Sequence, residues 1–380
     1  MHEHRDLLFD VAARAADYLE VIDDRPVHPG RVVDLDRLDG PLPDGPTDPA
    51  GVVALLHEVG GRATVSSAGG RYFGFVTGGA LPAALAANWL AGAWDQNAAL
   101  SVMSPAASRL EEVSLRWVVE ALGLPGGTGG ALVTGATMAN FAALAAARHA
   151  LSARAWWDVG ADGLYGAPPV RVVVGEEVHV SVLKALSMLG LGRRRVERVP
   201  VDDQGRMRAD ALPHLDDQTV LCLQAGNVNT GASDPFEELI AAARQKAAWV
   251  HVDGAFGLWA AASPRLAGQV RGVEGAHSWA TDGHKWLNVP YDCGIVLVAH
   301  PTHLEEAMSL SAAYLGQSAG RQGMNWSPES SRRARGVEVW AALRSLGGTG
   351  LAELLERCCR HARRFAEGLS AAGFEVLNQV

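Results

Sequence analysis

Lys285 lies between His284 and Trp286, at the end of the run Ser278-Trp-Ala-Thr-Asp-Gly, and few other charges are near it. A lysine in apolar surroundings can have a lowered pKa, and its neutral amine then attacks carbonyl groups. The competing interpretation is a lysine whose stem packs on Trp286 while its head reaches water. The motif alone does not choose between the two.

A second candidate site is the turn from an apolar strand into an Ala-rich helix. Gly135 ends the strand that contains Leu132, and Ala136 and the hydroxyl residue Thr137 begin the helix. Free backbone N–H groups and the helix dipole converge at such a turn, which suits a phosphate. The competing interpretation is that Thr137 serves only as a helix N-cap.

Two further side chains follow apolar runs. His179 comes just after the strand candidate that ends at Val174 and precedes a predicted helix, where a purely structural histidine is the competing interpretation. Asp253 ends the run Trp249-Val-His-Val, and an acid there is costly to bury without a cationic or protonated partner. We therefore favour a functional role for Asp253 over that of a capping residue.

Ligands of open α/β sheets bind at the carboxyl ends of the strands, where all four features are expected. Together they match the needs of pyridoxal phosphate. The turn at Thr137 would anchor the phosphate, and Lys285 would hold the aldehyde as a Schiff base. Asp253 would pair with the pyridine nitrogen and keep it protonated, and His179 would lie against the ring.

At this point the sequence resembles a known family over nearly its whole length, the group II pyridoxal-phosphate-dependent amino-acid decarboxylases (aromatic-L-amino-acid and glutamate decarboxylase-like). The segments that carry the resemblance are His284 to Leu287 with Asp292 to Gly294, His251 to Gly257, His179 with Lys184, Asp17 to Glu20 with Arg25 to Val27, Arg71 to Phe75, and Ser331 to Arg344. Aminotransferases share the fold but not the His-Lys-Trp context.

The resemblance implies a fold-type I α/β architecture. This has a mostly parallel seven-stranded sheet with helices on both faces, an N-terminal helical arm, and a small C-terminal domain that is expected to be incomplete here. We expect the arm at residues 1–67, the cofactor domain at 68–301, and a mobile loop with the start of the small domain at 302–380. A homodimer with shared active sites is also implied.

The resemblance also assigns roles to residues, and no metal is expected. The residues expected to be catalytic are Lys285, Tyr314 and His179, with Tyr314 delivering a proton to the substrate Cα from the loop after the lysine. Those expected to bind the cofactor are Lys285, Asp253, His179, Ala136, Thr137, His284 and Thr230.

Two segments depart from the family pattern, and one further acid needs attention. Met138 stands where an acid usually follows the cradle hydroxyl. After the strand at Val220, two asparagines and a threonine replace the usual threonines, so Asn227, Asn229 and Thr230 remain alternatives for the cofactor contact. Asp282 is expected near the phosphate, where an acid is unfavourable unless it faces away.

The composition is that of a globular protein, because 48% of the 380 residues are hydrophobic and 20% are charged. The net charge of −9 provides no basic face for nucleic acid. The four cysteines have no CxxC spacing, which argues against a disulfide framework or zinc site and favours a reducing cytoplasm. No segment is expected to span or bind a membrane, and the apolar stretch 78–94 is predicted to be a buried helix.

Short apolar runs alternate with Ala-rich helical runs, which indicates a parallel sheet covered on both faces. Strands are predicted at 131–134, 170–174, 195–200, 220–223, 249–252 and 294–298. Helices are predicted over the first twenty residues and from about Pro49, Met138, Val180, Asp210, Pro235, Ser331 and Leu351. A Gly/Ser-rich segment is expected between Thr302 and Ser327.

The expected function is the decarboxylation of an L-amino acid to its amine and CO₂. Tyr72, Phe73 and Phe75 favour an aromatic over an acidic substrate, because no Arg or Lys is assigned to a second carboxylate. The alternatives are another fold-type I pyridoxal-phosphate enzyme, such as an aminotransferase or an aldolase-type lyase, and a catalytically inactive homologue.

Overall fold

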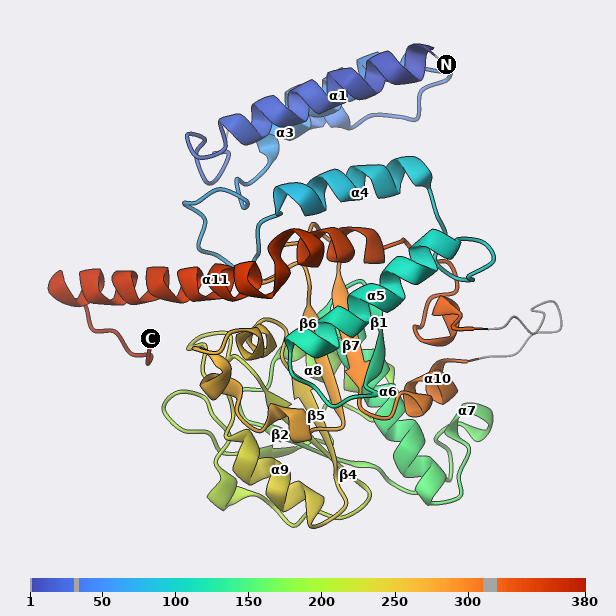
Figure 1. Ribbon diagram of the computed structural model, residues 1–380, viewed down its shortest axis with the longest axis vertical. Helices are drawn as coiled ribbons and strands as arrows, with labels where there is room; N and C mark the ends of the chain where they lie inside the picture. Colours follow the sequence, from blue (N-terminus) through green and yellow to red (C-terminus); the bar gives the residue numbers. More distant parts are fainter. Residues whose placement is uncertain (1, 31–33, 310–319) are drawn as a thin grey trace. The chain divides into compact units, whose positions relative to one another are not determined.

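The computed structural model describes residues 2–30, 34–309 and 320–380, and the chain forms two compact units, Met1–Gly79 and Ala80–Val380 (Figure 1). The first unit is helical. Its elements are α1 (His2–Glu20), η1 (Leu35–Leu38), α2 (Pro49–Leu55), η2 (Leu56–Gly60) and α3 (Gly61–Ala63). The helices predicted at the N-terminus and from Pro49 are therefore confirmed.

Local sequence explains these helices and how they join. Asp48 caps α2 by accepting a hydrogen bond from the Gly51 amide at 3.2 Å, and Pro49 occupies the first turn, where no amide donor is needed. The Arg25 guanidinium lies 4.7 Å from the centre of the Tyr18 ring and donates to the Gly61 carbonyl at 2.7 Å. Arg25 thus ties α1 to α3.

The second unit is built on a seven-stranded sheet in the order β1-β7-β6-β5-β4-β2-β3. The strands are β1 (Gly129–Val133), β2 (Arg171–Gly175), β3 (Glu197–Val199), β4 (Thr219–Gln224), β5 (Trp249–Asp253), β6 (Ser278–Asp282) and β7 (Gly294–Val298). Only β7 runs against its two neighbours, β1 and β6. The carboxyl ends of the other six strands therefore share one edge of the sheet.

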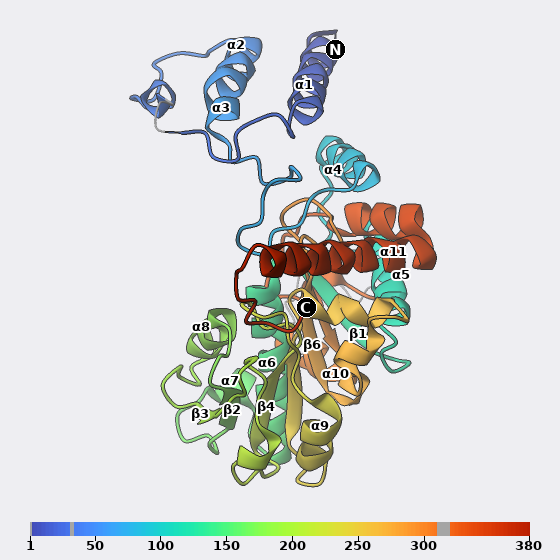
Figure 2. The same ribbon diagram turned by 90° about the vertical axis from the view of Figure 1, so that its left-hand side faces the viewer.

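Helices cover both faces of this sheet, because alternate side chains of each strand point to opposite sides. One core contains Val172 and Val174 and packs against α6 (Ala136–Arg154), α8 (Val180–Met188) and α10 (Thr302–Met308). The other core contains Val173 and packs against α5 (Pro105–Ala121), α9 (Phe236–Arg244), η4 (Gly257–Ala262) and α11 (Gly336–Ala371). Figure 2 shows α8 and α9 on opposite sides of the strands.

All six predicted strands are present, and the sheet gains a seventh, β6, which the sequence pattern did not mark as a strand. The fold-type I α/β prediction, with a mostly parallel sheet and helices on both faces, is confirmed. The remaining short elements are α7 (Val159–Asp162), η3 (Ala209–Ala211), η5 (Ala267–Val270), η6 (Val273–Gly275) and η7 (Gly323–Asn325).

Three predictions about the local structure need correction. The helix expected from Asp210 is only the three-residue η3, because Pro213 forces Leu212 into an extended conformation. The stretch after Thr302 begins with α10 rather than with irregular chain. The helix expected to be buried, α4 (Pro82–Trp94), buries only Ala84, Ala87 and Ala91; Trp89, Leu90 and Trp94 are 43–53% exposed.

The C-terminal helices follow the prediction more closely. One long helix, α11, begins at Gly336 and contains a break at Gly347, whose φ of 60° is not helical. Glycine adopts this left-handed region without strain, so the chain can change direction there. Among the described residues, no helix combines the length and the apolar character that crossing a membrane requires.

Candidate functional site

The predicted cofactor residues gather at the carboxyl edge of the sheet in the second unit. Asp253 ends β5, Asp282 ends β6, and Lys285 lies three residues beyond β6. Thr137 lies in the first turn of α6, which follows β1, and His179 is the residue before α8, which follows β2. Because these four strands are parallel, features far apart in the sequence share one edge.

Lys285 is held by Asp282. Its Nζ lies 3.1 Å from the Asp282 Oδ2, and Asp282 is buried, with only 2% of its surface exposed. His284 Nε2 lies 3.6 Å from the Asp282 Oδ1, while its Nδ1 accepts a hydrogen bond from the Cys293 amide at 3.0 Å. Burial lowers the pKa of His284, which favours a neutral ring with its proton on Nε2, facing Asp282.

Asp282 lies at the predicted phosphate cradle, as expected from the sequence, and it does not face away from it. Its Oδ1 accepts a 2.6 Å hydrogen bond from the Ala136 amide, the first N–H of α6. A carboxylate is favourable there because it complements the positive end of the helix dipole. An internal anion therefore occupies an amide that the sequence had assigned to the cofactor, while the neighbouring Thr137 hydroxyl has no hydrogen-bond partner within the described residues.

The cradle also depends on a close approach between two backbone segments. A β-carbon at Gly294, the first residue of β7, would overlap the backbone of Gly135, at a separation that real β-carbons do not show. Glycine at position 294 therefore permits the start of α6 to lie against the start of β7, next to Asp282.

Asp253 is 4% exposed and is held by two side chains that the sequence reading missed. Its Oδ2 accepts from Asn140 Nδ2 at 3.1 Å and from Ser181 Oγ at 3.2 Å. Burial raises the pKa of Asp253, while its neighbours His179 and Lys285 and the Asn140 hydrogen bond act in the opposite direction. The buried carboxylate is thus held by hydrogen-bond donors from α6 and α8.

His179 serves as the N-cap of α8. Its Nδ1 accepts from the Ser181 amide at 3.3 Å and lies 2.8 Å from the Ser181 hydroxyl oxygen. The same hydroxyl contacts Asp253, so Ser181 links the two residues. His179 can therefore cap α8 and still lie beside Asp253.

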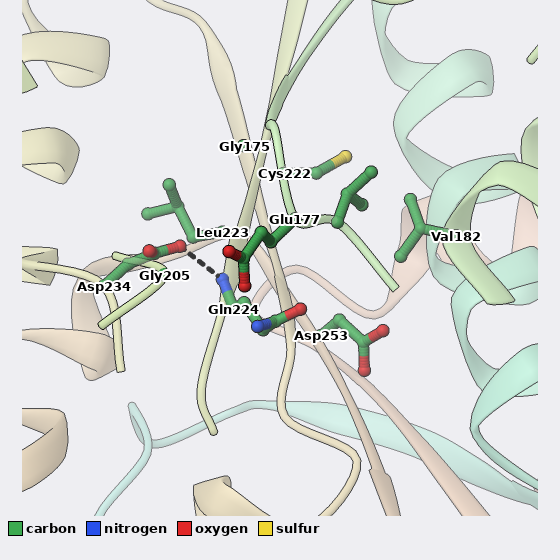
Figure 3. A pocket seen from close by; sticks show the side chains of 10 residues that line it. Gly175, Glu177, Val182, Gly205, Cys222, Leu223, Gln224, Asp234 and Asp253 are labelled. Atoms are coloured by element: carbon green, nitrogen blue, oxygen red, sulfur yellow. Dashed lines mark hydrogen bonds between the residues drawn. The ribbon is translucent and has the colours of Figure 1, made fainter. Parts of the chain in front are cut away.

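A small cavity of about 20 Å³ lies beside Asp253 (Figure 3). It is lined in part by Glu177, Gly205, Gln224 and Asp234. Asp234 accepts hydrogen bonds from the Met207 and Gln224 amides, both at 2.7 Å. Burial raises the pKa of Asp234 to about 6.

The loop after β4 uses its polar side chains internally. Asn227 donates to Glu177 Oε2 at 2.8 Å and accepts from the amides of Asn229 and Thr230. The Thr230 hydroxyl donates to the Gln204 carbonyl at 2.6 Å. None of these contacts joins Thr230 to Lys285 or Asp253 in the described part of the chain, so its cofactor role stays a prediction.

Two predicted groups lie elsewhere. Tyr314 lies outside the described residues. Tyr72, Phe73 and Phe75 belong to the first unit, where Phe73 and Phe75 are 74% and 91% exposed. The signals that could have identified the missed residues were modest: Asn140 is a polar residue in an otherwise Ala-rich helix, and Ser181 follows His179 by two positions.

Comparison with known proteins gives a consistent result. The model of the pyridoxal-dependent decarboxylase conserved domain matches residues 67–380. An aromatic-L-amino-acid decarboxylase of Bacillus atrophaeus is 25% identical, over 97% of this chain and 77% of that protein. A tyrosine decarboxylase of Oryza sativa subsp. japonica is 31% identical, over 92% of this chain and 69% of that protein.

A solved structure shares the fold. The crystal structure of Oryza sativa TDC with PLP and tryptamine superposes with a TM-score of 0.84 at 24% identity, covering 93% of this chain and 76% of that one. At this identity the likeness concerns the fold alone.

Proposed function

The chain belongs to the pyridoxal-dependent decarboxylase family, and from this premise we propose that Lys285, Asp253, His179 and the start of α6 form the cofactor site of an enzyme that acts on an aromatic L-amino acid. The enzyme is a pyridoxal-phosphate-dependent carboxy-lyase, which converts an amino acid into its amine and CO₂. The assignment of individual residues and of the substrate is our proposal.

The residues at the sheet edge fit pyridoxal phosphate in three respects. Lys285 supplies an amine that is 20% exposed, Asp253 supplies a buried acceptor, and Thr137 supplies a hydroxyl at a helix N-terminus. One feature opposes the fit, because Asp282 already accepts from the Ala136 amide. The convergence of Lys285 and Asp253 at one edge is the observation that carries the proposal.

Bound pyridoxal phosphate supplies a protonated ring that accepts the electron pair left behind when CO₂ departs. The protein residues prepare for that chemistry. Asp253 would accept a hydrogen bond from the ring nitrogen and keep it protonated. Asp282 neutralises the Lys285 ammonium in the buried site, and His179 would offer a flat face held in place by Ser181. Tyr314 is proposed as the group that delivers a proton to the substrate Cα.

The proposal of an aromatic substrate has two supports. Two relatives carry names that specify aromatic-L-amino-acid and tyrosine decarboxylation. Tyr72, Phe73 and Phe75 provide three aromatic rings in a segment that resembles a substrate-pocket segment of the family. Because aromatic side chains pack favourably on one another, these rings suit an aromatic substrate better than a second carboxylate.

A substrate panel tests the proposal. The purified chain with pyridoxal phosphate is incubated with tyrosine, tryptophan, phenylalanine, glutamate and aspartate, and both CO₂ and amine are measured. We expect equal yields of amine and CO₂ from at least one aromatic substrate and little from the acidic ones. Release of a keto acid or an aldehyde without amine would instead indicate an aminotransferase or another lyase.

We further propose a homodimer with shared active sites. The exposed apolar side chains of α4, which are Trp89, Leu90 and Trp94, support an additional interface. Light scattering after size exclusion should give twice the 40.0 kDa chain mass. The proposed three-part division of the chain at residues 67 and 301 is checked by limited proteolysis, which should cut near those boundaries first.

We propose that the enzyme works in a reducing compartment, in line with the cytoplasmic location expected from its cysteines. All four cysteines are free thiols, and burial raises the pKa of Cys222 and Cys293. Thiols of this kind are poor nucleophiles and form no cross-link here. Cell fractionation would test the location.

A further inference from the structure

A row of buried hydrogen bonds connects Trp249 to Asp253 through the interior of the second unit. Trp249 Nε1 donates to Ser278 Oγ at 3.0 Å, and that oxygen lies 3.0 Å from His251 Nδ1. The opposite ring nitrogen, His251 Nε2, lies 2.8 Å from Asn140 Oδ1, and Asn140 Nδ2 donates to Asp253 at 3.1 Å. His251, Asn140 and Ser278 are fully buried, at 0% exposed.

The chemistry of Trp249 gives this row a direction. An indole N–H donates and cannot accept, so the Ser278 oxygen must receive it. The Ser278 hydroxyl proton is then available for His251 Nδ1, which leaves the ring proton on Nε2. That proton is donated to the Asn140 oxygen, and Asn140 Nδ2 donates to Asp253 at 3.1 Å and to Ser181 Oγ at 3.2 Å. Each donor in the row therefore faces Asp253.

The reverse arrangement is chemically possible but poorer. In it, Asp253 would be protonated and would donate to Asn140, whose amide would donate to His251 Nε2. His251 Nδ1 would then donate to Ser278, which already accepts from Trp249. The Ser278 proton would have no partner within the described residues, and an unpaired buried hydroxyl is costly. Trp249 therefore selects one of the two directions.

We propose that Trp249 acts as the fixed end of a one-way hydrogen-bond chain, Trp249–Ser278–His251–Asn140, that positions Asp253 as a carboxylate ready to accept a hydrogen bond from the cofactor ring nitrogen. These four are positioning residues. The inference rests on the proposed function only where it names the cofactor ring nitrogen as the donor to Asp253. The direction of the hydrogen-bond chain is a property of the protein alone.

The hydrogen-bond chain counteracts the effect of burial on the pKa of Asp253. The titratable groups around Asp253 are His179 and Lys285, which favour its carboxylate, and Asp282, which opposes it. Burial raises the pKa of Asp253, and burial lowers the pKa of His251 to about 3, so His251 stays neutral and can act as both donor and acceptor. A neutral histidine transmits the direction set by Trp249 without adding a second charge.

Nuclear magnetic resonance of the full chain labelled with ¹⁵N-histidine tests the direction first. The His251 signals are identified by their absence in His251→Gln. At neutral pH, without and with pyridoxal phosphate, we expect an unprotonated Nδ1 and a protonated Nε2. A protonated Nδ1 in the wild-type protein would overturn the proposal, and this result does not depend on whether the cofactor binds.

Variants test whether Trp249 sets that direction. Trp249→Phe is compared with Trp279→Phe. Trp279 is also buried, but its indole N–H donates to the Val273 carbonyl and takes no part in the hydrogen-bond chain. In Trp249→Phe we expect a mixture of His251 tautomers and cofactor binding weakened by up to about tenfold, the net effect of one hydrogen bond between neutral groups. Trp279→Phe should keep the wild-type tautomer and affinity.

Ser278→Ala provides a smaller change at the next position of the chain. It should weaken cofactor binding to a similar extent, and adding Trp249→Phe should produce little further loss, because both changes break the same chain. Additive losses, or an unchanged His251 tautomer in both variants, would contradict the proposal. Failure of the wild-type protein to bind pyridoxal phosphate would contradict the proposed function. The His251 tautomer would still test the direction of the hydrogen-bond chain in that case.

Discussion

The Asp282 carboxylate lies 3.1 Å from the Lys285 ammonium nitrogen, and its other oxygen accepts from the amide that opens α6. Asp282 therefore binds the two groups that a bound cofactor would also need. The phosphate would bind the amide at the start of α6, and the aldehyde would react with the Lys285 amine. This relationship makes Asp282 a competitor of the cofactor within its own site.

Asp282→Asn should bind pyridoxal phosphate more tightly, by about fivefold, because a negative charge is removed next to the expected phosphate position. The affinity is measured by fluorescence titration of the cofactor-free protein at low and high salt, and the gain should shrink at high salt. Asp234→Asn is the matched control, since Asp234 is also buried and accepts two amides. Weaker binding in Asp282→Asn would show that the carboxylate helps to hold the cofactor.

Lys285→Ala should abolish covalent capture of the cofactor. The chain has only three lysines, Lys184, Lys246 and Lys285, so peptide mass spectrometry after borohydride reduction assigns the modified residue directly. We expect the adduct on Lys285 in the wild type and in Lys184→Ala. In Lys285→Ala we expect no adduct and CO₂ release lowered by about a thousandfold or more. An adduct on another lysine would remove Lys285 from its proposed role.

Tyr314→Phe should slow amine formation while leaving the absorbance of the bound cofactor intact, because only the phenolic proton is lost. Turnover and the absorbance spectrum are measured on the same preparation. Tyr165→Phe, at a tyrosine that is 98% exposed, is the control for a general effect of the substitution. Unchanged turnover in Tyr314→Phe would exclude Tyr314 from proton delivery.

The protein should become less stable in acid because His277 is then protonated. Burial lowers the pKa of His277 to about 4, and its Nδ1 accepts from the Val250 amide at 2.9 Å. Because the unfolded chain takes up this proton near pH 6.5 and the folded chain only near pH 4, the unfolded state binds more protons between these values. The contribution of the neutral His277 to the free energy of unfolding, about 3 kcal/mol, is present above pH 6.5 and is lost as the pH falls toward 4.

Urea unfolding at pH 7 and pH 4.5 measures this contribution. His277→Gln should lose less stability between the two pH values than the wild type does, while His214→Gln, at an exposed histidine, should behave like the wild type. Equal pH dependence in all three proteins would show that His277 does not couple folding to protonation.

The sequence predicted the strands that are mostly apolar and missed β6, and the difference has a physical cause. Ser278, Thr281 and Asp282 give β6 a polar composition, yet all three are buried. Their burial is tolerable because the Ser278 hydroxyl meets His251 and Asp282 meets Lys285. Such partners come from other elements, so the hydrophobic pattern of the strand itself does not reveal them.

The candidate site shows the same limit. Lys285, Asp253 and His179 could be selected because each stands where an apolar run ends. Asn140 could not, since its role comes from contacts with His251 and Asp253, which are 111 and 113 residues away in the sequence. Residue types and spacing thus identified the groups with chemical potential, while the side chains that orient them became visible only in the folded chain.

Gly294 should tolerate no substitution, although it takes no part in the chemistry of the site. A saturation library at position 294 should return glycine alone, because any β-carbon would overlap the Gly135 backbone. Invariance there would nevertheless report the proximity of two backbone segments and no chemistry of its own. An evolutionary profile of this chain would therefore mark Gly294 as strongly as Lys285, and only the geometry separates the spacer from the reactive group.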